Sequence, residues 1–503
     1  MNSTTADADA SPATLQTVEQ SFRPVRVTRA VLMGGAAVGG LAAWALDGQA
    51  LGVGFFVVTV AFVALLLLGS GREGRQSARG HRWLLAAAVL LAGFVAVRDS
   101  ALLVALDGLA VVTLLLLAVR GWNGEQPVWE VTLAGLSTAP LSVVGEGTRT
   151  GAAAIGAAVG NSRLIESAPR LVVPAAKMAL VGGPIVGLVT FLLAEGDAAF
   201  RAQLESGTDA LIELPLPEAT RMALVGLCSF TLATGLVAWA LRRRSLARAP
   251  ETTRPNLQLG LPEALAVLLG LTVVLALFGV VSTRCAFAPE ACELPRGVTY
   301  SVYARRGFWE LLAVAAIVLM TVLSVPHRLT ATTSAARRAV RVAASALVVA
   351  TLPMLLSAVN RMMLYEDVYG FTRQRVLSQA VCVFVGLLLV WRAVTLWTWP
   401  HRFAVGVVAA GALVLLGFNA LNPDAFIARK NVERPGAIDA AYLRELSADA
   451  ASVLRAVPAE RLGAYDAALF AQRRSAPGSL ASFNLARACD RAGGAHLEGQ
   501  LCP

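Results

Sequence analysis

Long apolar stretches alternate with short polar segments along almost the whole chain. About 17 to 25 residues suffice to span a bilayer, or slightly fewer with tilt. The two stretches within 83–119 are divided only by Arg98, Asp99 and Ser100, so they could instead form one broken or re-entrant unit. The pattern predicts an all-α polytopic transmembrane helical bundle of about 11 spans, at residues 30–46, 51–69, 83–98, 101–119, 174–194, 222–241, 261–282, 308–326, 342–359, 376–398 and 403–421.

Composition agrees with this class. Of the residues, 56% are hydrophobic and only 15% are charged, and the mean hydropathy is +0.64. A soluble protein of this length would carry more charge. The net charge of +10 comes from arginines in small groups between the apolar stretches, which is typical of membrane topology rather than of nucleic-acid binding. We expect the lipid bilayer as a partner, and no nucleic acid.

The same arginines predict the orientation, because short cytoplasmic loops are rich in Lys and Arg. With the N-terminus in the cytoplasm, the segment 195–221 lies outside and carries six carboxylates against two arginines. The C-terminus is then extracytoplasmic. The inner loops contain Arg72, Arg75, Arg79, Arg82, Arg242, Arg243, Arg244, Arg248, Arg328, Arg337, Arg338 and Arg341.

The spans divide the chain into five predicted parts. Residues 1–29 are expected to be a disordered cytoplasmic N-terminus, and 120–173 a cytoplasmic or interfacial segment. Residues 30–119 form the N-terminal transmembrane helices, and 174–421 form the transmembrane core. Residues 422–503 form a small extracytoplasmic helical tail. In the tail Asp439 can cap one long helix with an apolar stripe at Tyr442, Leu446, Ala450 and Leu454.

The first span and the long inner segment each leave an alternative open. The small-x-small sequence Ala43-Trp44-Ala45 would permit cleavage by signal peptidase. In the inner segment, GAAAIGAAVG (Gly151 to Gly160) places small residues at helical spacing, which favours a helix packed closely on its neighbours or in the membrane interface. A phosphate-binding loop is the alternative, but its glycine motifs are absent.

Cysteine placement is consistent with this topology. Cys228 and Cys382 lie within spans, whereas the other four cysteines fall in predicted outer segments. Disulfides persist in oxidising compartments, so we predict the pairs Cys285–Cys292 and Cys489–Cys502, with four unpaired thiols as the alternative. The histidines lack metal-ligand spacing, and no serine-hydrolase motif occurs. We therefore predict no metal and no cofactor.

Three polar clusters fall on the predicted outer face: Tyr303–Glu310, Asn360–Arg375 and Asn422–Arg434. In the first, Arg306 and Glu310 are four residues apart and can pair. In the second, Gly370 suits a helix end and Thr372 an N-cap, so this segment is predicted to be a tight helical hairpin. The candidate site residues are Tyr303, Arg305, Arg306, Glu310, Arg361, Tyr365, Asp367, Tyr369, Arg373, Asn422, Asp424 and Arg429.

We expect these clusters to form one site or one pinned cluster. Arg361, Tyr365 and Tyr369 recur every four residues, so one helix face should stack a cation under two phenols. Arg361 is expected near Asp367 or Asp424.

The clusters also carry a family resemblance. The sequences YARRGFWELL, LYEDVYGFTRQR and NPDAFIARKNVER, together with GPIVGLVTFLLAEGDAAF at 183–200, resemble bacterial multi-spanning membrane proteins classed as the domain of unknown function 4173 family, with related 4153 proteins. The resemblance covers about residues 170–455. Gly196 and the Glu366-Asp367 pair depart from the family pattern, which has Ala and a single acidic residue there. The resemblance implies a bacterial inner-membrane protein without an established activity.

Three functions compete for these features. A non-enzymatic cell-envelope scaffold, assembly or sensing protein fits the outer tail and the scarcity of catalytic motifs. A membrane enzyme acting on an anionic lipid-linked substrate is the alternative, because guanidinium groups suit phosphate and a carboxylate such as Glu366 could act as acid or base. An anionic lipid or an envelope component is then a further candidate partner. A transporter is the third possibility, with Pro184 and Pro353 as helix breaks.

Overall fold

The computed structural model describes residues 28–46, 50–70, 79–123, 129, 131–159, 190, 203, 218–241, 258–287, 300–330, 333–436, 438–462, 468, 475 and 479–492. Within these residues every regular element is a helix, and no strand is present. The expected all-α class is therefore confirmed for the described part of the chain.

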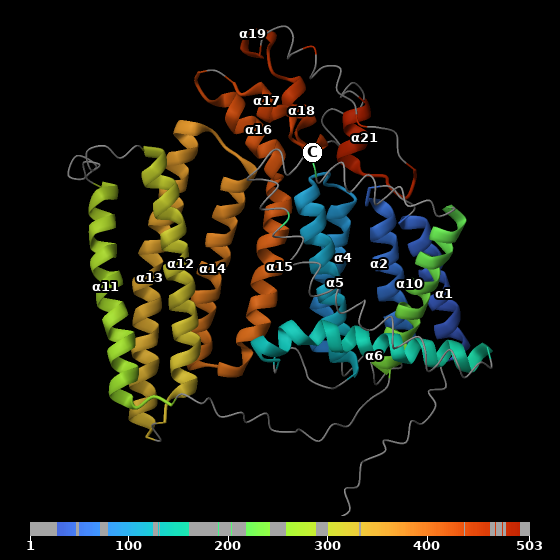
Figure 1. The fold of residues 1–503 in the computed structure, drawn as a ribbon, viewed down its shortest axis with the longest axis horizontal. Coiled ribbons are helices and arrows are strands. Elements are labelled where there is room, and N and C mark those ends of the chain that lie inside the picture. The colour runs from blue at the N-terminus through green and yellow to red at the C-terminus, as the bar shows by residue number, and fades with distance from the viewer. Residues whose placement is uncertain are drawn as a thin grey trace, which may run out of the picture.

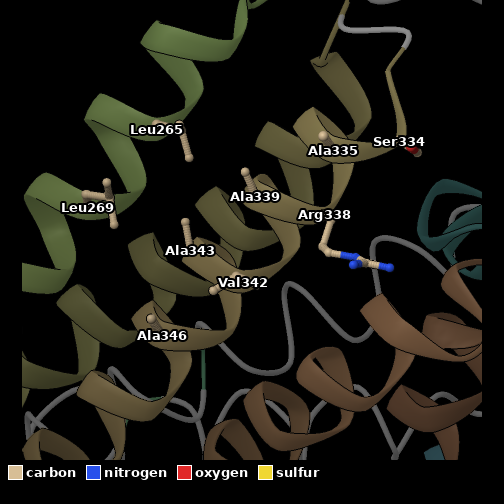
Figure 2. Close-up of a pocket in the computed structure, with 9 residues that line it drawn as sticks. All are labelled: Leu265, Leu269, Ser334, Ala335, Arg338, Ala339, Val342, Ala343 and Ala346. Atoms are coloured by element: carbon tan, nitrogen blue, oxygen red, sulfur yellow. The ribbon is translucent and has the colours of Figure 1, made fainter.

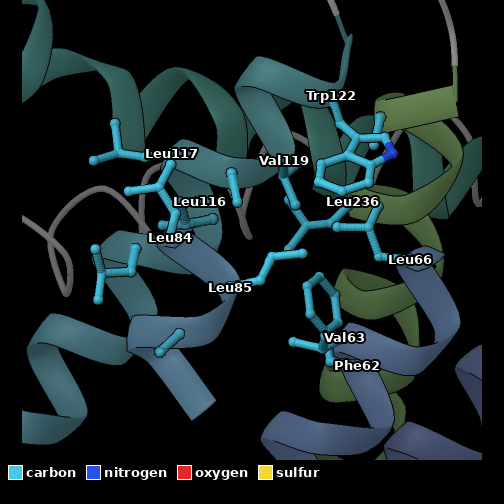
Figure 3. Packing of buried hydrophobic residues seen from close by; sticks show 14 of the residues in the cluster. Phe62, Val63, Leu66, Leu84, Leu85, Leu116, Leu117, Val119, Trp122 and Leu236 are labelled. Atoms are coloured by element: carbon cyan, nitrogen blue, oxygen red, sulfur yellow. The ribbon is translucent and has the colours of Figure 1, made fainter. Parts of the chain in front are cut away.

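Two groups of helices stand side by side (Figure 1). The first group packs around a core that includes Phe62, Leu85 and Trp122, seen in Figure 3. It contains α1 (Arg29–Ala45), α2 (Val53–Gly69), α4 (Arg82–Val95), α5 (Ala101–Asn123) and α10 (Glu218–Leu241).

The second group has its own core, which includes Phe308, Leu347 and Leu389. It contains α11 (Leu261–Phe287), α12 (Tyr300–Arg328), α13 (Ser334–Tyr369) and α14 (Arg373–Trp397). Between the two groups stands α15 (Phe403–Leu421), which packs on α14 from one group and on α4 and α5 from the other. The two cores are therefore joined through α15.

Seven described helices are long and apolar enough to cross a membrane. Three further apolar helices, α1, α2 and α4, are shorter, with 17, 17 and 14 residues. The predicted span at 174–194 falls almost wholly outside the described residues. The chain is thus a multi-pass membrane protein, while the count of eleven spans stays a prediction. The seven are α5, α10, α11, α12, α13, α14 and the segment from Pro400 through α15.

The stretches within 83–119 are two helices that form a hairpin. Helices α4 and α5 pack against each other, and an atom added to Gly121 near the end of α5 would meet the ring of His81, which precedes α4. The hairpin excludes one span broken at this point, whereas two spans and one re-entrant unit both stay predictions, because α4 has only 14 residues. Arg98, Asp99 and Ser100 form the turn of this hairpin.

Helix α13 is longer than a bilayer is thick. It has 36 residues and continues through Pro353, so the expected helix break at this proline is wrong. The 20 residues from Arg341 to Arg361 rise about 30 Å, which equals the thickness of the hydrocarbon core. Both arginines are therefore expected at the depth where an apolar helix leaves the membrane.

Helix α6 (Leu133–Val159) lies across the ends of the first group rather than along them (Figure 1). Its glycines permit close packing on α10, because a side chain on Gly235 would overlap the main chain of Gly147 and Gly151, and one on Gly151 would overlap Thr231. The described part of GAAAIGAAVG is helical, which agrees with the packing interpretation and not with a phosphate-binding loop.

A set of short helices covers the opposite end of the bundle from α6 (Figure 1), and we call residues 422–462 and 479–492 the cap. The single long helix expected after Asp439 is wrong. Asp439 does accept a hydrogen bond from Tyr442 N, but Ser447 starts a new turn by accepting one from Asp449 N. The cap contains α16 (Pro423–Glu433), α17 (Ala440–Arg444), η6 (Ala448–Ala450), α18 (Ala451–Arg455), α19 (Ala459–Leu462) and α21 (Leu485–Ala492).

Several turns of the bundle meet the cap at one end, as an alternating topology requires. Val53 N at the start of α2 donates to Phe483 O at 2.8 Å, and Leu485 N donates to Ala96 O at 2.9 Å after α4. At the other end, the main chains of Leu259 and Arg328 are hydrogen-bonded. The predicted alternation of loops between the two ends of the bundle thus matches the contacts.

Candidate functional site

The second and third polar clusters meet at an ion pair between α14 and α16, in which Asp424 is fully buried and Arg373 is 27% exposed. Arg373 donates from Nε to Asp424 Oδ1 at 2.8 Å and from Nη2 to Asp424 Oδ2 at 2.6 Å. Ser447 N also donates to Asp424 Oδ2, at 2.9 Å. The Asp424 side chain is completely buried, so both of its oxygens are bound by groups of the protein itself.

The sequence places Asp424 for this role. Asn422 has a positive φ of 53° and accepts a hydrogen bond from Ala425 N, and Pro423 occupies the first turn of α16. Asp424 therefore lies in that first turn, where the helix dipole also favours a negative charge.

Burial alone would raise the pKa of Asp424. Hydrogen bonds and charge from Arg373, with the hydrogen bonds from Ser447, outweigh burial and hold the pKa below its ordinary value. Asp424 is thus ionised and paired.

The hairpin between α13 and α14 is bound to the cap through its main chain. Gly370 has φ 82°, and the side-chain amide of Asn431 accepts from Phe371 N at 2.7 Å and donates to Phe371 O at 2.8 Å. Arg373 N donates to the hydroxyl of Tyr442 at 2.9 Å. A side chain at position 370 would lie 2.8 Å from Asn431 Oδ1, so glycine is required there twice, by φ and by space.

The two phenols expected on one face of α13 are in contact, with 4.9 Å between the ring centres of Tyr365 and Tyr369, but the rings are tilted by 52° and not stacked. The cation over Tyr365 is Arg375, whose Cζ lies 4.2 Å from the ring centre. Arg375 also donates to the main-chain oxygen of Gly370. This cation comes from the following helix, across the turn, and not from the i, i+4 position at Arg361.

A second buried ion pair joins the cap to the α4–α5 hairpin. Asp449 Oδ2 accepts from Asp99 N at 2.8 Å and from Ser100 N at 2.9 Å, while its Oδ1 lies 3.7 Å from Nη1 of Arg98. In turn Asp99 Oδ2 accepts from Ala448 N at 3.2 Å. Burial raises the pKa of Asp449, against its hydrogen bonds and Arg98, and burial lowers the pKa of Arg98.

The last cap helix adds a third set of anchors. Asn484 Nδ2 donates to the main-chain oxygens of Val95 and Arg98, at 3.1 and 2.7 Å. Arg487 lies 3.2 Å from the Asp99 carboxylate, and within the cap Arg455 pairs with Asp490. Arg98, Asp99 and Ser100, which the sequence shows only as an interruption between two apolar stretches, thus form a docking point for cap residues about 350 to 390 positions later.

A buried polar pair lies deeper, between α5 and α15. Asn419 Nδ2 donates to Asp107 Oδ1 at 2.8 Å, and both side chains are fully buried. Arg98 Nε donates to the main-chain oxygen of Asn419 at 3.0 Å, so the pair is connected to the Arg98–Asp449 anchor. Sequence reasoning missed Asp107, although a carboxylate alone within an apolar span is a recognisable signal.

The remaining predicted site residues are distributed as follows. The side chains of Tyr303, Arg305 and Arg306 lie outside the described residues, so the Arg306–Glu310 pair stays a prediction. Arg361 is half-buried on α13, and Asp424, one of its two expected partners, is held by Arg373 instead. The side chains of Glu310, Asp367 and Arg429 are exposed.

The predicted disulfides are not settled by the described residues. Cys228 and Cys382 are free thiols, as expected for the two cysteines within spans. Cys285 lies in the last turn of α11 and Cys489 on α21, but Cys292 and Cys502 lie outside the described residues. Both pairings stay predictions.

An open hollow of about 660 Å³ lies between α11 and α13, far from the cap (Figure 2). Its walls are apolar, with Leu265 and Leu269 on one side and Ala339 and Ala346 on the other, and Arg338 points away from the two leucines. It contains none of the predicted site residues. Within the described residues, no group of three His, Cys, Asp or Glu side chains could hold a metal ion.

The sequence matches one protein family, described as a domain of unknown function (DUF4153), over residues 84–457. This range begins in α4 and ends after α18, so it includes the Arg98, Asp107, Arg373, Asp424 and Asp449 side chains. No curated protein and no solved structure gives a significant match. The match covers well over half of the chain and agrees with the resemblance seen in the polar clusters. The chain therefore belongs to the DUF4153 family of proteins.

Proposed function

We propose that the protein is an integral inner-membrane protein of a bacterial cell and a non-enzymatic component of the cell envelope, with a scaffold, assembly or sensing role. In this proposal the cap is extracytoplasmic and presents the surface through which the protein acts. The bundle holds that surface at a fixed height above the bilayer.

The observation that carries the proposal is the saturation of Asp424. Both of its oxygens accept hydrogen bonds, from Arg373 and from Ser447, and its side chain is fully buried. A carboxylate in this state cannot take a proton from a substrate. The two N–H groups with which Arg373 could bind a phosphate already donate to Asp424. The arrangement of Arg373, Asp424 and Ser447 is therefore better explained as a clamp that holds the cap on the bundle than as a binding site for an anion.

The distribution of arginine supports the orientation. The end of the bundle away from the cap carries Arg328, Arg337, Arg338 and Arg341 in and around the turn between α12 and α13. Short cytoplasmic loops are enriched in such residues. This supports an extracytoplasmic position for the cap, where the predicted Cys489–Cys502 disulfide would be in an oxidising compartment.

The enzyme alternative depends on the exposed residues of the same clusters. Arg429 is exposed on α16 and Asp367 is exposed on α13, so these two could meet an anionic lipid-linked substrate. The scaffold role thus requires Arg373 and Asp424, whereas the enzyme role requires Arg429 and Asp367. Mutating each pair of residues therefore distinguishes the two functions.

The test is complementation of a strain that lacks the protein, scored by resistance to detergents and other envelope stresses. Under our proposal, Arg373→Ala and Asp424→Ala abolish complementation because the cap detaches, whereas Arg429→Ala and Asp367→Ala complement fully. Membrane accumulation of each variant is measured by blotting, and cap docking by limited proteolysis. Loss of complementation by Arg429→Ala or Asp367→Ala, with a docked cap and normal accumulation, would contradict the scaffold and favour the enzyme.

A further inference from the structure

The Asp107–Asn419 pair has one unused oxygen on each side chain. Asn419 Nδ2 donates both to Asp107 Oδ1, at 2.8 Å, and to Leu415 O, at 3.0 Å, so both amide hydrogens are used. Asp107 Oδ2 and Asn419 Oδ1 are buried and accept no hydrogen bond within the described residues. The amide cannot be rotated to relieve this, because its oxygen would then face two other acceptors.

An ionised Asp107 would have no cation beside it. Its one bonded partner among the described residues is Asn419, and Arg98 contacts the main chain of Asn419 rather than the carboxylate. The position is about 9 Å along α5 from its first residue, which is within the apolar depth of a membrane helix. A charged carboxylate without a partner is costly at that depth, whereas a neutral one is not.

Among the described side chains, no other ionisable group on the elements packed against α5 bonds to this carboxyl group. On α15 the neighbour is Asn419, which does not titrate. The described ionisable side chains on the packed elements, on α5 itself and in the turn before it are His81, Arg82, Arg98, Arg120, Glu146, Arg149, Glu218, Arg221 and Cys228.

We propose that Asp107 and Asn419 form an intramembrane proton-binding site. A proton on Asp107 Oδ2 neutralises the carboxyl group and turns its unused acceptor into a donor. That donor can bond to the unused Oδ1 of Asn419, which closes a ring of two hydrogen bonds between a carboxylic acid and an amide. One bound proton thus satisfies both buried oxygens.

The site is connected to the cap through Asn419. The main-chain oxygen of Asn419 accepts from Arg98, which faces Asp449 of the cap at 3.7 Å. Binding or release of the proton changes the side-chain hydrogen bonds of Asn419, and the main-chain oxygen of the same residue accepts the hydrogen bond from Arg98. This inference does not depend on the scaffold role, because the proton site would serve a sensor or a transporter equally.

The test is infrared spectroscopy of the purified full-length protein in lipid nanodiscs at neutral pH. We expect the carbonyl stretch of a protonated carboxylic acid in the wild type and its loss in Asp107→Asn, which can keep both hydrogen bonds as an amide pair. Asn419→Leu should shift the band, because the hydrogen bond is lost. The control Asp367→Asn, on an exposed carboxylate, should leave the band unchanged.

Labelling the aspartate carboxyl carbon with ¹³C in the wild type gives a second measurement that needs no variant. The band should move, because it belongs to an aspartate. The proposal is overturned if no aspartate-derived acid band exists at neutral pH, or if that band persists unchanged in Asp107→Asn. It is equally overturned if replacing choline chloride by sodium chloride abolishes the band, since the site would then bind a metal cation.

Discussion

Asp99 and Asp449 each accept a hydrogen bond from the main chain of the other's turn. Asp449 Oδ2 accepts from Asp99 N at 2.8 Å, and Asp99 Oδ2 accepts from Ala448 N at 3.2 Å. The turn of the α4–α5 hairpin and the 3-10 turn of the cap are thereby joined by reciprocal bonds, with Arg98 buried beneath them. The cap is thus part of the folded core rather than a loosely attached tail.

Replacing Asp449 by Ala should strongly destabilise the protein, because it leaves Arg98 buried without its carboxylate. Loss of one partner of a buried ion pair costs about 3–5 kcal/mol. Glu433→Ala is the control, since Glu433 pairs with Lys430 at the surface, 3.7 Å apart, and such pairs contribute about 0–1 kcal/mol. Thermal unfolding in detergent micelles measures both. Equal, small losses for the two variants would show that the Asp449 anchor is not required.

Docking of the cap should weaken at acid pH through Asp424. The folded-state pKa of Asp424 lies below its ordinary value of 3.8, so its stabilising contribution is complete above about pH 3.8 and is lost as pH falls through the lower folded pKa. The pKa of Asp449 is raised, so its contribution to stability is greatest at low pH and is lost as pH rises. Limited proteolysis of the cap should therefore be compared between wild type and Asp424→Asn, in which the Asp449 contribution changes little, because the charge of Asp424 is the smallest of the causes that shift the pKa of Asp449. Below about pH 4 the cap of the wild type should become more sensitive to the protease, and Asp424→Asn should not show this additional change. Parallel curves for the two proteins would contradict this assignment.

Close packing of α6 on α10 should fail when Gly235 is enlarged. A side chain at Gly235 overlaps the main chain of Gly147 and Gly151, and main chain cannot move as a flexible side chain can. We expect Gly235→Ala to lower the unfolding temperature. Gly270→Ala on α11 is the matched control, because nothing lies within 4 Å of the added atom, and the change should be neutral or stabilising by up to about 1 kcal/mol. A neutral Gly235→Ala would show that α6 does not pack as described.

Reporter fusions test the proposed orientation. Fusions after Arg244 and Arg341 should report the cytoplasm, and fusions after Glu213 and Ala440 should report the outer compartment, because the arginine-rich loops stay inside. A cytoplasmic report after Ala440 would reverse the orientation of the cap. Labelling of Cys489 and Cys502 in intact cells complements the fusions: labelling of both without reductant would exclude their disulfide.

Local sequence signals were sufficient for much of the fold. The apolar stretches matched α1, α2, α4, α5 and α10–α15, because an apolar run of this length has few other stable forms in a membrane. Gly370 marked the end of α13, because a positive φ there favours glycine.

The anchors of the cap could not be predicted, because they depend on residues far apart in the chain. Nothing local to Arg98 or Asp449 indicates that they meet, and Asp424 pairs with Arg373 rather than with Arg361 because the α13–α14 turn directs Arg373 toward α16. The long helix expected after Asp439 was wrong for a related reason. Ser447 and Asp449 favour a turn that aims Asp449 at the α4–α5 hairpin, and this tertiary contact outweighs helix propensity.

A double-mutant cycle on Arg373 and Asp424 tests most directly whether these two residues clamp the cap onto the bundle. The free energy of unfolding is measured by denaturant titration in mixed micelles for the wild type, Arg373→Ala, Asp424→Ala and the double variant. We predict that the double variant loses less stability than the sum of the single variants, with a coupling of about 1–3 kcal/mol, because it leaves no charge buried alone. Additive losses, within about 0.5 kcal/mol, would contradict the clamp.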